Sequence, residues 1–434
     1  MSEHLLRKCL FGGVLIALSL CRPARAAPLD AFLKAARQRN AEAQISRAEL
    51  AVAEATLTRA RAALLPNLNV SASYARNQYP VEVTLPGAPG MPAQSVVVTP
   101  RDQLDATFTA QVPLFDGQAY ARLQGATASR QAAAAHDRAA IEDVLLAVLR
   151  AYHEALSARG VEEAAQHAWE AAQATEQRLA ARVEEGRATT LQLRRAQADT
   201  ARARQSLVNA TTARTAAART LATLSGLDER PSAIESPVPA RLDVPALVAS
   251  AIDRRADVAA ARAERDAARA SAREARWAYA PSLAARGSER LTNATGFAGR
   301  EATWEVSVVL TWNLFDSLGR EAGVRESDAR LAQAETRLAD RLRRTRDEVA
   351  NAVDRMRAAE ESLQAAREEE TAAVEAARLA REAVEAGTAT SVDLTVAERD
   401  AFSAQVSLAR AQADLAVAVA EVKHATGEPI GGAP

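Results

Sequence analysis

The sequence predicts a mainly α-helical protein with a membrane β-barrel contribution, built from one structural unit that occurs twice in the chain. Three observations support this fold class. Of 434 residues, 48% are apolar but only 4% are aromatic, which is typical of long alanine-rich helices rather than a large globular core. Two runs of about seventy residues contain no proline, and the second half of the chain repeats the pattern of the first.

The N-terminus has the pattern of a secretory signal peptide. In residues 1–26, Arg7 and Lys8 precede the apolar run CLFGGVLIALSLC, and a small-residue cleavage site follows that ends at Ala26. Acylation of Cys21 as a lipoprotein is the alternative, but Leu20 precedes this cysteine where the processing enzyme requires a small residue. Either signal predicts export from the cytoplasm.

The two cysteines and the charge balance exclude some classes of protein. Cys9 and Cys21 both lie in the leader, so the mature chain is expected to form neither a disulfide framework nor a thiolate metal site. The leader holds four of the 54 basic and one of the 55 acidic residues, which leaves 50 basic and 54 acidic. This balance does not indicate nucleic-acid binding. No later segment reaches the apolar length of a membrane-spanning helix, which excludes only helical spanning.

Two homologous halves account for almost the whole mature chain. An offset of 215 aligns the first helices and the following LPNL (65–68) with APSL (280–283), and an offset of 200 aligns VPLFDG (112–117) with WNLFDS (312–317). We therefore expect five segments: a signal peptide at 1–26, a first repeat at 27–226, a linker at 227–244, a second repeat at 245–427 and a tail at 428–434. Each repeat should contain one helical hairpin, at 117–224 in the first and at 317–426 in the second.

Each half begins with a helix and continues with two strands. Apolar and polar residues alternate with a period of two at about 67–77 and 104–113, and again at about 282–291 and 302–313. The first pair is joined by a loop that contains five prolines. The third strand has the least regular pattern, because Arg286, Glu289 and Arg290 interrupt it.

The long proline-free runs, 117–185 and 317–386, predict single helices of about 100 Å. Each ends at a glycine, Gly186 or Gly387. A threonine three residues later is followed, at the spacing of a capping box, by Gln192 or Asp393. These signals predict that each long helix reverses at a short tip and returns as an antiparallel helix. The two phrases are EEGRATTLQLRRAQAD (184–199) and EAGTATSVDLTVAERD (385–400).

Export and the alternating strands together indicate an outer-membrane barrel, because lipid admits only structures whose backbone polar groups are all paired. Four strands cannot close a barrel, eight leave an interior filled by side chains, and twelve leave room for a lumen. We therefore expect a homotrimer with a twelve-stranded barrel that contacts outer-membrane lipid. The expected lipid-facing residues are Leu68, Val70, Tyr74, Phe108, Val112, Trp304, Val306, Val308, Leu310 and Trp312.

With its doubled plan, its two LFD turns and its two G-x-x-T tips, the chain from 28 to 427 resembles the TolC family of outer-membrane efflux and secretion channels. This resemblance implies a trimeric twelve-stranded barrel on an α-helical periplasmic tunnel. It implies passive conduction of substrate to the exterior from a periplasmic adaptor and an inner-membrane pump of the RND or ABC type. The adaptor would dock on the tips, which comprise Gly186, Arg187, Ala188, Thr189, Gly387, Thr388, Ala389 and Thr390.

The sequence departs from the family pattern at two places. The family often has Arg-Pro-Asp where this chain has RAD (255–257). Some members carry two acidic residues one turn apart near the second tip; here Asp393 matches the first and Val396 takes the second place. A gate built from a double ring of carboxylates is therefore in doubt, and Asp393 is the single candidate for a pore gate.

No residue pattern predicts catalysis, a cofactor or a metal site. The mature histidines, at 136, 153, 167 and 424, share no metal-binding spacing, and no nucleophile elbow or phosphate loop is present. The alternative from another class is a soluble periplasmic coiled-coil adaptor or scaffold. An adaptor should contain one helical hairpin flanked by compact β domains, whereas this chain has two hairpins and four amphipathic strands.

Overall fold

The computed structural model describes residues 26–87, 93–232 and 243–430. The expected leader, apart from Ala26, lies outside these residues with both cysteines, as do most of the expected linker and the end of the tail. The chain divides into two compact units. The tip unit comprises the chain up to 36 with 148–235 and 368–413; the sheet unit comprises 37–147, 236–367 and 414 onward.

The helical segment that opens each half consists of two consecutive helices. In the first half these are α1 (Leu29–Arg39) and α2 (Ala41–Ala62), and in the second they are α5 (Val244–Arg254) and α6 (Ala256–Trp277). The first break occurs at Asn40, which has an extended ψ of 136° and whose side chain accepts a hydrogen bond from the Glu42 backbone at 2.9 Å. One asparagine therefore caps α2 and separates it from α1.

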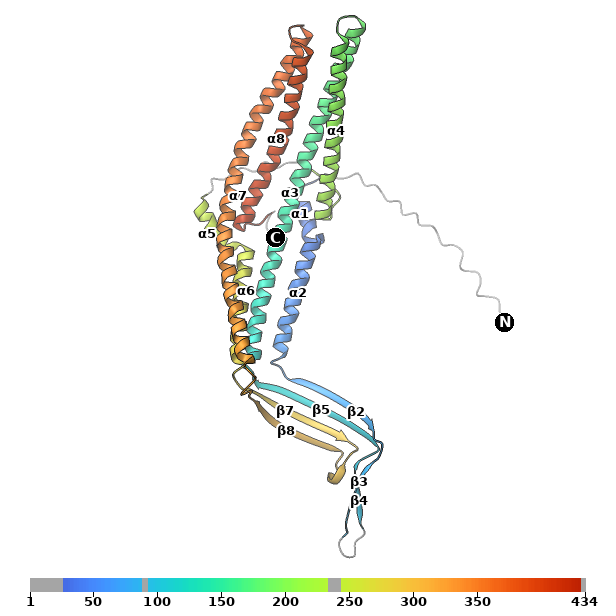
Figure 1. Ribbon diagram of the computed structural model, residues 1–434, viewed down its shortest axis with the longest axis vertical. Coiled ribbons are helices and arrows are strands. Elements are labelled where there is room, and N and C mark those ends of the chain that lie inside the picture. The colour runs from blue at the N-terminus through green and yellow to red at the C-terminus, as the bar shows by residue number, and fades with distance from the viewer. Residues whose placement is uncertain (1–25, 88–92, 233–242, 431–434) are drawn as a thin grey trace, which may run out of the picture. The chain divides into compact units, whose positions relative to one another are not determined.

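Four antiparallel strands of the sheet unit form one sheet in the order β2-β5-β7-β8, in which β5 and β7 join the two halves (Figure 1). The strands are β2 (Asn67–Arg76), β5 (Asp102–Phe115), β7 (Ser282–Thr292) and β8 (Ala302–Thr311), and a 3-10 helix, Gly296–Ala298, lies between the last two. β7 had the least regular sequence pattern, yet it is paired along both edges, with β5 on one side and β8 on the other. Its backbone hydrogen bonds come from these neighbours and do not depend on the alternation of its own side chains.

The segment expected as a proline-rich loop instead contains a hairpin of β3 (Val81–Leu85) and β4 (Gln94–Thr99), and this expectation was wrong. The physical reason is the position of the prolines. Pro80, Pro86 and Pro100 flank the strands, where they remove no ladder hydrogen bond, and β-branched residues fill the positions between them.

In the tip unit, β1 (Ala26–Ala27) pairs in parallel with β6 (Arg230–Pro231).

Equivalent aspartates accept backbone hydrogen bonds from the first turn of each long helix. The Asp116 carboxylate accepts from the Ala119 backbone at 2.9 Å at the start of α3 (Gly117–Glu184), and Asp316 accepts from Arg320 at 3.0 Å at the start of α7 (Gly319–Glu385). The repeated LFD phrases are thus helix caps. α3 and α7 contain 68 and 67 residues; the returning helices are α4 (Thr190–Ser225) and α8 (Ser391–Thr426).

Each unit has its own core. In the tip unit the buried rings of Phe32 and Tyr152 meet edge to face at 5.5 Å, and most of the other buried apolar residues are alanines. In the sheet unit Val258, Val349 and Val353 are completely buried. In the part of the chain that the structure describes, no helix combines the length and apolar character needed to cross a membrane.

Candidate membrane surface and helical tips

The sheet has one apolar face. Residues directly opposite each other in antiparallel strands point to the same side of the sheet. The registers are Val70↔Phe108, Phe108↔Glu289 and Glu289↔Trp304. One face therefore carries the even-numbered residues of β2, β5 and β8 together with the odd-numbered residues of β7. This face carries nine of the ten residues expected to face lipid, all exposed in the single chain: Leu68, Val70, Tyr74, Phe108, Val112, Trp304, Val306, Val308 and Leu310.

The tenth residue, Trp312, follows β8 directly, and its indole nitrogen donates to the Tyr279 carbonyl oxygen at 3.1 Å. Aromatic side chains therefore stand near both ends of the apolar face, with Trp304 and Tyr74 toward the β7–β8 loop and Trp312 toward the helices. Trp304 and Trp312 are eight residues apart, or about 26 Å of strand, close to the apolar band of about 25 Å in outer-membrane barrels.

The opposite face of the sheet is polar and carries its own ion pair. Arg290 on β7 contacts Asp105 on β5, with 2.5 Å between Nη2 and Oδ1, and Arg286 donates to the Gln111 side chain at 3.4 Å. Both arginines made the third strand look irregular in the sequence. Their neighbours on this face are asparagine, serine, threonine and glutamine residues of β2 and β5.

Sequence reasoning missed two features of the apolar face. Glu289 lies on it between Phe108 and Trp304, and its neighbours were unknown without the register. At the loop end, the Tyr74 hydroxyl donates to Asp102 at 2.7 Å, and Arg76 is 3.8 Å from the same carboxylate. The available signal was the appearance of charged residues at the start of β5 and the end of β2. Polar groups therefore border the apolar face where it ends.

The first tip closes through local hydrogen bonds. Gly186 has a φ of +71°, and the next residue, Arg187, donates its backbone N–H to the Arg182 carbonyl at 2.7 Å, which completes the helix end. Thr189 and Gln192 then form the predicted capping box: each side chain accepts from the other's backbone N–H, at 3.3 and 2.9 Å. This prediction is confirmed.

The second tip repeats these contacts with an acid. Gly387 has a φ of +76°, Thr388 donates its N–H to the Ala383 carbonyl at 2.8 Å, and Asp393 accepts from the Thr390 backbone at 2.9 Å and from the Thr390 hydroxyl at 2.7 Å. The Thr390 hydroxyl, followed by its N–H, holds the pKa of the Asp393 carboxyl below its usual value. The carboxylate of Asp393 is therefore ionised at neutral pH.

The tips present mostly exposed small residues. Of the eight tip residues only Ala188 and Ala389 are half-buried, and a side chain built on Gly186 or Gly387 would meet no atom within 4 Å. Val396, which replaces the second acid of some relatives, is exposed one turn after Asp393. The structure thus places one carboxylate and one apolar side chain on this turn.

Two histidines of the helices each pair with a single acid. His136 is 2.7 Å from Glu264 and His424 is 2.8 Å from Asp143. Within the residues that the structure describes, no group of three or more His, Cys, Asp or Glu side chains could hold a metal ion.

Comparisons with known proteins agree with this geometry. An outer membrane channel of Campylobacter jejuni, CmeC, is 16% identical with a TM-score of 0.79 over 95% of this chain and 90% of that chain. The outer membrane protein VceC of Vibrio cholerae is 21% identical with a TM-score of 0.75 over 93% and 96%. A membrane protein of Pseudomonas aeruginosa is 20% identical with a TM-score of 0.78 over 93% and 94%.

At these identities the structures show a shared fold, and a comparison with curated proteins finds no match. The family evidence comes from the sequence itself. The family model described as outer membrane efflux protein matches residues 32–227 and 247–428, which is most of both repeats. The chain therefore belongs to the outer membrane efflux protein family.

Proposed function

We propose that three copies of this chain close a twelve-stranded barrel and form the passive outlet of a tripartite efflux pump or a type I secretion system. The protein is an outer-membrane efflux channel that extends into the periplasm, and its family comprises channels rather than enzymes. The alternative, a soluble periplasmic adaptor, finds no support in the family match.

The observation that carries the trimer proposal is the four-stranded sheet, which has one apolar face and one polar face. Its outer strands, β2 and β8, each have one edge without a partner strand among the described residues. An unpaired edge in lipid leaves backbone N–H and C=O groups without partners, each at a cost of several kcal/mol. Pairing β8 of one copy with β2 of the next would remove every edge. The ten lipid-facing candidates would then contact outer-membrane lipid, and Arg286, Arg290 and Asp105 would line the lumen.

We also propose that the two tips form the surface on which a periplasmic adaptor docks, and that an inner-membrane pump of the RND or ABC type feeds the channel. Small exposed residues support this role, because they let a partner helix approach the backbone closely. Asp393 would be repeated three times in the trimer. If the three carboxylates face the channel axis, they would favour cations in the lumen.

The channel proposal can be tested on cells and in planar bilayers. Full-length protein expressed in a Gram-negative host should fractionate with the outer membrane, and the purified protein should open ion-conducting pores in a lipid bilayer. Heat-unfolded protein from the same preparation is the control. Recovery in the periplasmic extract together with an absence of conductance would contradict the proposal.

A further inference from the structure

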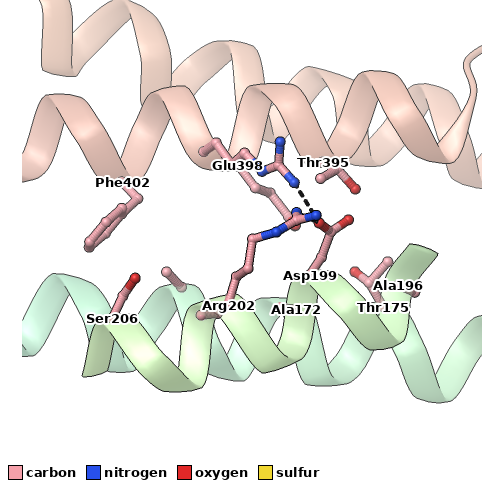
Figure 2. A pocket seen from close by; sticks show the side chains of 12 residues that line it. Ala172, Thr175, Ala196, Asp199, Arg202, Ser206, Thr395, Glu398 and Phe402 are labelled. Carbon is pink, nitrogen blue, oxygen red and sulfur yellow. Dashed lines mark hydrogen bonds and ion pairs between the residues drawn. The ribbon is translucent and has the colours of Figure 1, made fainter. Parts of the chain in front are cut away.

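The tip unit contains a cavity of about 230 Å³ between the two helical hairpins (Figure 2). Ala168 and Ala172 of α3 and Ala196 and Ala203 of α4 line one side, and Phe402 of α8 closes the other. The cavity exists because alanine side chains are too short to fill the space between these helices. An apolar cavity of about 150 Å³ is enough to bind benzene in other proteins. This one has room for one or two aromatic rings.

Charged side chains gather at one end of the cavity. Arg399 of α8 contacts the Asp199 carboxylate of α4 at 2.5 Å, and Arg202 of α4 contacts the same oxygen (Figure 2). The other lining acid, Glu398, accepts from Arg381 at 3.3 Å. The lining therefore contains two acids and two arginines, and Arg381 beside it adds a third guanidinium group, which leaves one positive charge in excess around the cavity.

The two arginines retain hydrogen-bonding capacity that Asp199 does not use. A guanidinium has five N–H donors in a planar fork that matches a carboxylate in bidentate geometry. The Arg202 and Arg399 side chains are 63% and 56% exposed, whereas Asp199 is 20% exposed. A second carboxylate can therefore reach both arginines without displacing Asp199. Neutralising the excess charge would favour its binding.

We propose that this cavity binds a small aromatic carboxylate. The ring lies among the alanines against Phe402, and the carboxylate pairs with Arg202 and Arg399. Thr175, Ser206 and Thr395 also line the cavity, and their hydroxyls can form hydrogen bonds with polar substituents on the ring. The occupant contacts α3 and α4 of the first hairpin and α8 of the second. This site belongs to the folded chain and does not require transport activity.

The test uses the purified full-length protein in detergent and 2-naphthoate as the probe. Isothermal titration should show saturable binding with a Kd on the order of 100 µM, as ligand efficiencies for about a dozen non-hydrogen atoms allow. The neutral isostere 2-naphthamide fills the same volume but lacks the charge, and it should bind at least about tenfold more weakly. Equal affinity for the two compounds, or no saturable binding of 2-naphthoate, would overturn the proposal.

Variants locate the site. Arg202→Gln keeps the ion pair of Arg399 with Asp199 and should weaken 2-naphthoate binding about fivefold or more, since it removes a charge-assisted hydrogen bond. Arg204→Gln is the matched control, because Arg204 is also an exposed residue of α4 but does not line the cavity. Ala203→Leu should abolish binding by filling the volume. If Ala203→Leu fails to fold, the comparison of Arg202→Gln with Arg204→Gln still tests the site. Equal affinities of these two variants for 2-naphthoate would show that the probe binds elsewhere.

Discussion

Arg255 shows how one buried charge is accommodated in the sheet unit. Its side chain is 6% exposed, lies 2.7 Å from Asp257 and 2.6 Å from Glu348, and donates to the Ala425 carbonyl at 3.3 Å. Ala256 is the first residue of α6. The N–H at the first position of a helix has no helical partner, so alanine and proline are both tolerated there, and the Arg255 ion pairs form with alanine at this position.

A residue-scale prediction concerns Asp393 and the gate. Asp393→Asn keeps an oxygen acceptor for the cap but removes the charge, as in the equivalent Gln192. Trimers of this variant in planar bilayers should lose cation preference and block by trivalent cations, with unchanged thermal stability. Because the pKa of Asp393 is lowered, the wild-type preference should persist to pH values below the usual carboxyl range and disappear as the pH falls through that pKa.

Asp400→Asn, on the same helix and also exposed, is the control for this experiment and should leave selectivity intact. Unaltered selectivity and block in Asp393→Asn would show that Asp393 acts only as a helix cap.

A second residue-scale prediction follows from His153, which is 4% exposed and whose Nδ1 has no hydrogen-bond partner among the described residues. Burial lowers its pKa to about 4. Between pH 6.5 and 4 the unfolded chain binds a proton that the folded chain does not. The free energy of unfolding should therefore decrease as the pH falls from 6.5 to 4, and it should level off below pH 4. The decrease should be at most about 3 kcal/mol.

The measurement is the pH dependence of urea unfolding for wild type and His153→Leu, which cannot titrate at this position. His167→Leu is the control, since the His167 side chain on the same helix is 76% exposed. The same slope in wild type and His153→Leu across this window would refute the assignment.

At the scale of elements, the two repeats use the same local chemistry with different residues. Asp116 and Asp316 cap the long helices, and a left-handed glycine followed by a threonine cap forms each tip. The copies differ where α7 begins: Ser317 and Leu318 have φ values of 58° and 70°, whereas the first repeat has Gly117 after its cap. The duplicated turns therefore need not share the same backbone path.

The element-scale prediction tests the tip as a docking surface. Thr388→Trp adds a bulky side chain to the second tip without straining Gly387, whose positive φ disfavours any other residue. It should abolish export of a pump substrate in cells while leaving the yield of assembled protein unchanged. Ala372→Trp, at an exposed position fifteen residues before Gly387 on α7, should export normally. Normal export by Thr388→Trp would place the adaptor elsewhere.

At the scale of the whole molecule, the open sheet predicts assembly. In the part of the chain that the structure describes, the strand order leaves β2 and β8 with one unpaired edge each, and the adjacent apolar face is exposed in the single chain. Protein extracted from outer membranes in detergent should have three times the 46.0 kDa chain mass, less the leader, and should dissociate to one chain in SDS. Light scattering measures this mass. A monodisperse soluble monomer from periplasmic extract would contradict the assembly.

The sequence by itself determined the features that depend on near neighbours. The capping box at Thr189, the helix ends at Gly186 and Gly387, and the alternation of β2 and β8 all follow from residues a few positions apart. Even the repeat was visible, because both copies keep this local chemistry.

Only the tertiary structure decided which distant residues meet. Pairing of β5 with β7 sets Glu289 against Phe108, and packing of α8 on α4 brings Arg399 to Asp199 across 200 residues. No sequence pattern near these residues predicts either contact. Strand register and helix packing depend on all the contacts between two segments that are remote in the sequence, and no single residue sets them. The hairpin of β3 and β4 escaped prediction for a related reason: its prolines indicated a loop, and only backbone pairing of Val83 with Val96 shows that they lie outside its ladder.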